Sequence, residues 1–175
     1  MKQFRIAFLI LLLASPVFAE ISVPNFFGHH MVLQQGGKAK LWGRADAGAS
    51  VTVSFKDAQT TTKVGHNGKW SVEINTGTAD SKGADLTITS GKDTLKIKDV
   101  LVGEVWLASG QSNMAFTVSR SENATEEIAA ADYPGLRMFN ASSVTAADPM
   151  EDIAGSWTLT SAETAGNYSA VAYYF

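Results

Sequence analysis

Ser112 lies in the segment of the sequence that is best suited to chemistry. The apolar run Val105–Leu107 leads to Gly110, and Ser112 follows between Gln111 and Asn113. A serine nucleophile at such a site needs a rigid strand, a sharp turn at a glycine, and a hydroxyl exposed beyond the carboxyl edge of a sheet. The spacing therefore predicts a nucleophile directly after a buried strand containing Val105–Leu107. An ordinary strand followed by a polar turn has the same pattern.

An α/β unit is the element expected to position this serine. Val100–Ala108 is a nearly continuous apolar run, which is typical of a strand buried on both faces. A helix follows, with Asn123 as its cap, Glu126 three residues later and Pro134-Gly135 at its end. Leu136–Asn140 has the pattern of a second strand. Strand, loop, helix and strand in this order predict a βαβ unit of a parallel sheet.

The preceding part of the chain, up to residue 98, is a succession of short strand-like runs. Asn67-Gly68 predicts a tight hairpin between the fourth and fifth of them. Short strands at regular spacing predict a small antiparallel β-sandwich, immunoglobulin-like or jelly-roll-like. Such a module has a structural or a glycan-binding role. The candidate strands are Met31–Leu33, Ala39–Gly43, Ser50–Phe55, Thr60–Val64, Trp70–Ile74, Asp85–Ser90 and Thr94–Ile97.

The last eleven residues predict a helix, from about Ala165 to Phe175. Tyr168, Val171, Ala172 and Phe175 recur at helical spacing and would form its apolar face. The chain stops on an aromatic residue with no capping signal, and only two α/β strands precede it. We therefore expect the α/β part to be truncated and the chain to be the front part of a longer protein.

Residues 1–19 have the pattern of a secretory signal peptide. Lys2 and Arg5 give a charged start, Ile6–Ala14 an apolar core, and Val17–Ala19 a cleavage site. The alternative, a membrane anchor, needs roughly 20 apolar residues, and this stretch is too short. The mature protein is expected to be periplasmic or extracellular, with no membrane span.

Composition bounds the remaining chemistry. There are no cysteines, so neither a disulfide nor a thiolate nucleophile is available. The net charge of −3, without long charge runs, argues against a nucleic-acid partner. His29, His30 and His66 have no partners at metal-ligand spacing, so we expect no metal and no other cofactor. The oligomeric state is not indicated.

The block Gly110–Met114, with Val102–Leu107 before it, resembles the nucleophile block of the sialate O-acetylesterase family. That family belongs to the SGNH-type hydrolases. The resemblance extends upstream to Phe27–Gln35 and downstream to Glu126–Ala131 and Asn167–Phe175. It therefore covers nearly all of the chain after the expected signal peptide.

The resemblance implies an all-β sandwich over 20–98, followed over 99–175 by the start of a flavodoxin-like α/β SGNH-hydrolase domain. Ser112 would be the nucleophile and, through its backbone N–H, one oxyanion donor. Gly110, Gln111 and Asn113 would form the supporting loop. The implied reaction is removal of acetyl esters from sialic acid or another acetylated glycan.

Other parts of the family's catalytic machinery have no counterpart in this sequence. The late aspartate–histidine pair and the later glycine and asparagine of the oxyanion hole are missing. No histidine follows His66 in the sequence. His66 is the one histidine that we consider able to approach Ser112 as a base. For His29 and His30 we expect a packing or domain-interface role. The chain alone is thus expected to be an inactive esterase fragment, with a secreted, non-catalytic carbohydrate-binding or interaction module as the alternative.

Overall fold

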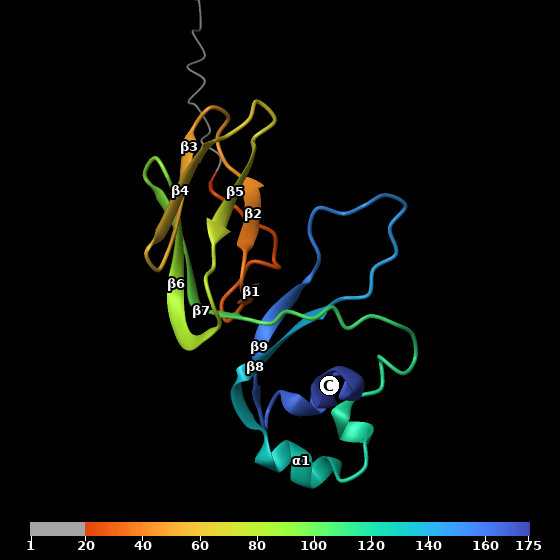
Figure 1. Cartoon of the computed structure of the whole chain (residues 1–175). Coiled ribbons are helices and arrows are strands. Elements are labelled where there is room, and N and C mark those ends of the chain that lie inside the picture. Colours follow the sequence, from red (N-terminus) through yellow and green to blue (C-terminus); the bar gives the residue numbers. More distant parts are fainter. Residues whose placement is uncertain (1–19) are drawn as a thin grey trace, which may run out of the picture.

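The computed structural model describes residues 20–175, which are mostly β-strand with a few short helices (Figure 1). The signal-peptide prediction falls outside the described residues. Seven strands form the first part of the chain, which we call the β-unit (residues 20–103). They are β1 (Val32–Gln34), β2 (Lys38–Arg44), β3 (Ser50–Phe55), β4 (Ala58–Lys63), β5 (Lys69–Asn75), β6 (Asp80–Ser90) and β7 (Asp93–Gly103).

Two sheets of the β-unit share one hydrophobic core. The larger has the order β1-β7-β6-β3-β4, and the smaller consists of β2 and β5. Alternation along the strands creates the core: Trp70, Val72 and Ile74 of β5 are buried, and the residues between them are exposed. They join Val51 and Val53 of β3 in a single buried cluster.

All seven strand predictions are confirmed, but two details of their pairing are wrong. β1 runs parallel to β7, with Leu33 opposite Val102, so the larger sheet is not purely antiparallel. The Asn67-Gly68 turn exists, with Gly68 at φ 74°. The strands that it joins belong to different sheets, because β4 pairs with β3 and β5 pairs with β2. A turn signal fixes the local chain reversal and leaves the ladder partner open.

The expected boundary at residues 98 and 99 lies inside a strand. β7 continues to Gly103, and its residues Val100 and Val102 are buried in the core of the β-unit. The apolar run predicted as one long strand is therefore divided. Its first part completes the larger sheet, and the chain leaves that sheet at Glu104.

The second part of the chain, the C-terminal unit (residues 104–175), is small and has its own core. Its elements are η1 (Val118–Arg120), α1 (Ala124–Ala130), β8 (Asp132–Ala141), β9 (Gly155–Ser161), η2 (Ala165–Asn167) and α2 (Ala170–Tyr174). Val118, Tyr168 and Tyr173 are at the centre of the core. The hydroxyl of Tyr173 donates to Glu127 (2.8 Å), and burial together with this carboxylate raises the pKa of Tyr173.

The predicted parallel βαβ unit is not formed by the described residues. β8 contains the expected strand Leu136–Asn140, but it pairs antiparallel with β9, with Phe139 opposite Trp157. The segment Val105–Leu107 pairs with neither strand. Antiparallel neighbours need only a loop between them, whereas parallel pairing needs a crossover, and here residues 142–154 form the loop.

The helix predictions of this unit need correction at their ends. Asn123 occupies the N-cap position of α1 in a left-handed conformation, but its side chain makes no capping hydrogen bond. Pro134-Gly135 lies inside β8, at an irregularity in its pairing with β9, rather than closing the helix.

The expected terminal helix is two short helices, η2 and α2, separated at Tyr168 and Ser169. The hydroxyl of Ser169 caps α2 by accepting from Ala172. The predicted apolar face is wrong in part, because Val171 and Phe175 are exposed while Tyr173 is buried.

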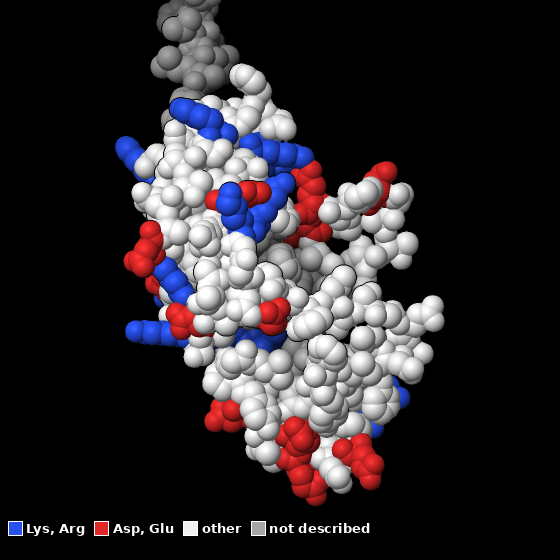
Figure 2. Space-filling view, viewed as in Figure 1, with Lys and Arg blue, Asp and Glu red and all other residues white. Residues whose placement is uncertain are grey.

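Charged side chains are mixed in sign on the visible face. Figure 2 shows Lys and Arg side chains mostly over the β-unit, with Asp and Glu among them and at the lower end of the molecule. No helix among residues 20–175 is long and apolar enough to cross a membrane.

Candidate functional site

Ser112 lies in an exposed turn of the long loop between β7 and η1. The Gln111 carbonyl accepts from the backbone N–H of Met114 (3.0 Å) and of Ala115 (3.3 Å), which closes the turn around the serine. Within residues 20–175, neither the hydroxyl nor the backbone N–H of Ser112 makes a hydrogen bond to another protein group. Both groups are therefore free to meet a ligand.

The strand that was expected before Ser112 is absent. Val105–Leu107 belongs to no strand, and Trp106 and Leu107 are 69% and 93% exposed. A strand buried on both faces needs partners on its edges and faces, and the described residues provide none at this position. The Ser112 hydroxyl is exposed, as the nucleophile prediction requires. The rigid strand that was expected to support it is not formed by the described residues.

Gly110 contributes space rather than an unusual backbone angle. Its φ is not positive, so the sharp turn expected there does not depend on a left-handed glycine. A Cβ at this position would lie 3.0 Å from Cγ of Met114, so any larger residue would press on that side chain. The turn around Ser112 is consequently tight on its inner side. Gln111 and Asn113 are exposed on either side of the serine.

The loop is anchored downstream of Ser112 by backbone hydrogen bonds to the end of the chain. Ala170 donates to the Phe116 carbonyl (2.8 Å), and Val118 donates to the Tyr168 carbonyl (3.0 Å). The hydroxyl of Ser169 also contacts Sδ of Met114 (3.6 Å). These contacts connect the serine-bearing turn to α2.

Upstream, the loop begins at a set of side-chain hydrogen bonds that we call the Gln–Glu clamp (Gln34, Gln35 and Glu104). The amide nitrogen of Gln34 donates to one carboxylate oxygen of Glu104 (2.9 Å), and that of Gln35 donates to the other (2.5 Å). These two hydrogen bonds hold the pKa of Glu104 below its ordinary value. The clamp joins the end of β1 to the residue at which the chain leaves β7.

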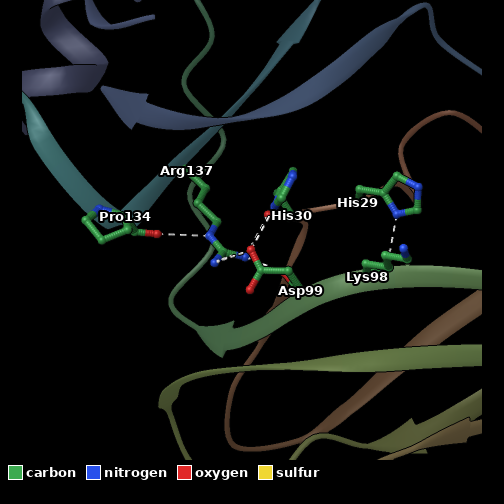
Figure 3. A network of polar contacts seen from close by, with 6 residues as sticks. All are labelled: His29, His30, Lys98, Asp99, Pro134 and Arg137. Atoms are coloured by element: carbon green, nitrogen blue, oxygen red, sulfur yellow. Dashed lines mark hydrogen bonds and ion pairs between the residues drawn. The ribbon is translucent and has the colours of Figure 1, made fainter. Parts of the chain in front are cut away.

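A second network joins the two units at Asp99. Nδ1 of His30 lies 2.7 Å from Oδ2 of Asp99, and Nη2 of Arg137 donates to the same oxygen (2.9 Å). Nη1 of Arg137 donates to the backbone carbonyls of Asp99 (2.5 Å) and His30 (3.2 Å), and Nε donates to that of Pro134 (3.1 Å). Figure 3 shows the three side chains pointing toward one another, with Arg137 from β8 reaching across to the β-unit.

The negative charge of Asp99 is balanced by the positive charge of Arg137. Partial burial of Asp99 disfavours its charged form, but the hydrogen bonds from His30 and Arg137 outweigh that effect and hold the pKa of Asp99 below its ordinary value. The Arg137 side chain is only 4% exposed. The His30 side chain thus pairs with Asp99 of its own unit, while its backbone carbonyl accepts from Arg137 of the other unit. Asp99 and Arg137 are partners that sequence reasoning missed. Spacings of 69 and 38 residues along the chain gave no signal of their proximity.

Aromatic side chains extend the contact between the units. Phe26 packs against Phe139 and Trp157, with ring centroids 5.4 and 5.7 Å apart, and the Trp157 indole donates to the Phe26 carbonyl (2.8 Å). A shallow groove beside this cluster is lined by Gly28, His29 and Trp157, among others. These contacts fix the hairpin β8–β9 on the β-unit.

None of the three histidines contacts Ser112. His30 is engaged with Asp99, and Nδ1 of His29 accepts from the backbone N–H of Lys98 (2.9 Å). His66 is exposed in the turn between β4 and β5. Among the described residues, no group of three or more side chains of the metal-ligating types is placed to hold a metal ion. Among residues 20–175, Ser112 is thus exposed and has no histidine in contact with it.

Comparison with known proteins identifies homologues over most of the chain. Sialate O-acetylesterase of Rattus norvegicus is 36% identical over 154 residues, 82% of this chain and 28% of that protein. Sialate O-acetylesterase of Homo sapiens is 34% identical over 170 residues, 86% of this chain and 32% of that protein. The chain thus spans about three tenths of the length of these relatives. No family model matches the chain.

The architecture described above is also found in a solved structure. The crystal structure of a carbohydrate acetylesterase from Xanthomonas citri superimposes with a TM-score of 0.85 at 29% sequence identity. The match covers 88% of this chain and 35% of that one. It includes far more than either unit alone, so the two units and their mutual arrangement recur together.

Proposed function

We propose that this chain, a homologue of the sialate O-acetylesterases, provides the nucleophile of a serine esterase that removes acetyl groups from carbohydrates. The observation that carries the proposal is the exposed turn at Ser112. Its hydroxyl and backbone N–H are both unengaged, within a chain that matches esterases over most of its length.

The proposed reaction is acyl transfer through a covalent acetyl-serine. The Ser112 oxygen attacks the acetyl carbonyl, a base takes its proton, and the sugar hydroxyl leaves with a proton returned by that base. The backbone N–H of Ser112 would donate to the oxyanion. Water then attacks the acetyl-serine, which releases acetate and restores the hydroxyl.

The base and the carboxylate that orients it would come from outside these 175 residues. We infer that residues 20–103 correspond to an all-β sandwich, and residues 104–175 to the first part of an SGNH-type domain. In that arrangement Val105–Leu107 would become a buried strand once its neighbours are present. We further propose export to the periplasm or the cell exterior, with cleavage after Ala19.

The proposal is tested with a hybrid, in which residues 20–175 replace the matching 35% of the Xanthomonas citri carbohydrate acetylesterase. We expect the hybrid to release acetate from an acetylated carbohydrate, and Ser112→Ala to abolish this release. The panel contains an O-acetylated sialic acid and acetylated xylan, which separates the two substrate classes. Ser109→Ala, three residues away in the same exposed loop, is the matched control and should retain activity. A folded hybrid whose activity survives Ser112→Ala would contradict the proposal.

A further inference from the structure

The Gln–Glu clamp lies where the Ser112 loop leaves β7. Between Glu104 and the turn at Gln111, the ring of Trp106 packs edge-to-face on that of Phe175, with the ring centroids 5.1 Å apart. Downstream, the loop is held by its hydrogen bonds to α2. The direction in which the chain leaves β7 is therefore set at Glu104.

The side-chain amide of Gln34 makes two hydrogen bonds at the start of the loop. Its Oε1 accepts from the backbone N–H of Val105 (2.8 Å), while its Nε2 donates to Glu104 (2.9 Å). A neutral amide can accept from a backbone N–H and donate to a carboxylate at the same time. Gln34 thus binds both the side chain and the backbone at the start of the loop.

The clamp is itself held by the β-unit on two sides. The buried hydroxyl of Thr76 donates to the Gln34 carbonyl (2.8 Å). Oε1 of Gln35 accepts from the backbone N–H of Ala79 (2.9 Å), and the backbone N–H of Gln35 donates to the Gly103 carbonyl (2.9 Å). Gln34 and Gln35 are therefore fixed relative to the sheet before they contact Glu104.

We propose that Gln34 and Glu104 are positioning residues for Ser112, through which the β-unit sets the path of the nucleophile loop. The functional part of this inference rests on the proposed esterase activity. The clamp does not touch the reacting atoms. It acts by holding the backbone at Val105, so that the loop leaves the sheet in one direction.

The first test measures hydrogen exchange of the Val105 amide by NMR in the 175-residue chain. Gln34→Ala removes the acceptor of the Val105 N–H, and Glu104→Ala removes the carboxylate that holds Gln34 in place. Each change should increase Val105 exchange about fivefold. The unfolding temperature should stay within about 2 °C, because the clamp is outside both cores. Glu73→Ala, which removes an exposed carboxylate paired with Lys38, is the matched control and should leave Val105 unchanged.

A swap variant separates positioning from a general loss of structure. In the double variant Gln34→Glu with Glu104→Gln, the residue at 34 still accepts from Val105 and now accepts from the residue at 104. Gln35 can still donate to the oxygen of the new amide. The swap should restore Val105 exchange to within about twofold of the original chain, and the single changes should not. Unchanged Val105 exchange in Glu104→Ala, or no rescue by the swap, would overturn the proposal.

The hybrid adds a catalytic readout. There Glu104→Ala should lower kcat about tenfold while KM stays within about twofold, and the swap should recover kcat. An equal fall for Glu73→Ala would contradict a positioning role. If the hybrid releases no acetate at all, the esterase proposal fails, whereas the exchange measurement still decides whether the clamp holds the loop.

Discussion

The 175-residue chain, expressed alone, should release no acetate above background from an aryl acetate or from an O-acetylated sialic acid. A serine hydroxyl is a weak nucleophile at neutral pH unless an adjacent base takes its proton. The described residues place no histidine in contact with Ser112, and His30 already pairs with Asp99. Loss of the base from a serine triad typically lowers the rate on the order of a millionfold. Acetate release, measured against a buffer blank, checks this expectation.

Ser112→Ala is the control for this measurement, because any residual release should be the same in both proteins. Robust turnover that disappears in Ser112→Ala would contradict the expectation. It would direct the search for a base to His66, which is exposed in the turn between β4 and β5. His66→Ala would then have to abolish that turnover.

Arg137→Met should destabilise the chain by about 2–4 kcal/mol and lower its unfolding temperature by roughly 5–15 °C. Methionine fills a similar volume but donates to none of the three carbonyls that Arg137 binds, and it leaves the Asp99 carboxylate with His30 alone. This loss of stability is smaller than that expected for breaking a fully buried ion pair, since the Asp99 side chain is 37% exposed. Thermal unfolding followed by circular dichroism measures the change.

Arg44→Met provides the matched control for this prediction. Arg44 also pairs with a carboxylate, Glu151, but both side chains are more than half exposed, so its removal should cost less than about 1 kcal/mol. Equal unfolding temperatures for the two variants would contradict the role assigned to Arg137.

The Arg137 network also has a pH signature. The pKa of Asp99 is lower in the folded chain than its ordinary value of 3.8. Its contribution to stability is therefore complete above that value and is lost as the pH falls through the folded pKa. As the pH falls through this acid range, Arg137→Met should therefore lose less stability than the original chain.

The β-unit was predictable because its signals are local. Short strand-like runs at regular spacing identified every strand of this unit without knowledge of its partners. Pairing was less predictable, since ladders depend on contacts between distant segments. The parallel pairing of β1 with β7 and the separation of β4 from β5 into different sheets illustrate this limit.

The C-terminal unit was harder to predict because the apolar run that leads into it is buried in its first part and exposed in its second. Val100 and Val102 are buried in the β-unit, whereas Trp106 and Leu107, a few residues later, are exposed. Hydrophobicity alone indicates that such a run can be buried and does not say which sheet will bury it. The position of Ser112 in an exposed turn was still predictable, because the polar residues around it favour a turn regardless of the neighbouring strand.

Interactions across large sequence separations were not predictable at all. Gln34 binds Glu104 across 70 residues, and Arg137 binds Asp99 across 38. Each side chain alone is an ordinary polar residue, and only the fold brings the partners together. The interface role of His30 was inferred, but its partners were not.

The central claim is that Ser112 is the nucleophile, and its most direct test is covalent labelling of the hybrid with a fluorophosphonate, which reacts with activated serines. Mass spectrometry of the digested protein locates the adduct. We predict a single adduct on the peptide that contains Ser112, which is lost in Ser112→Ala and retained in Ser109→Ala. An active hybrid that carries its adduct on a different serine would contradict the account.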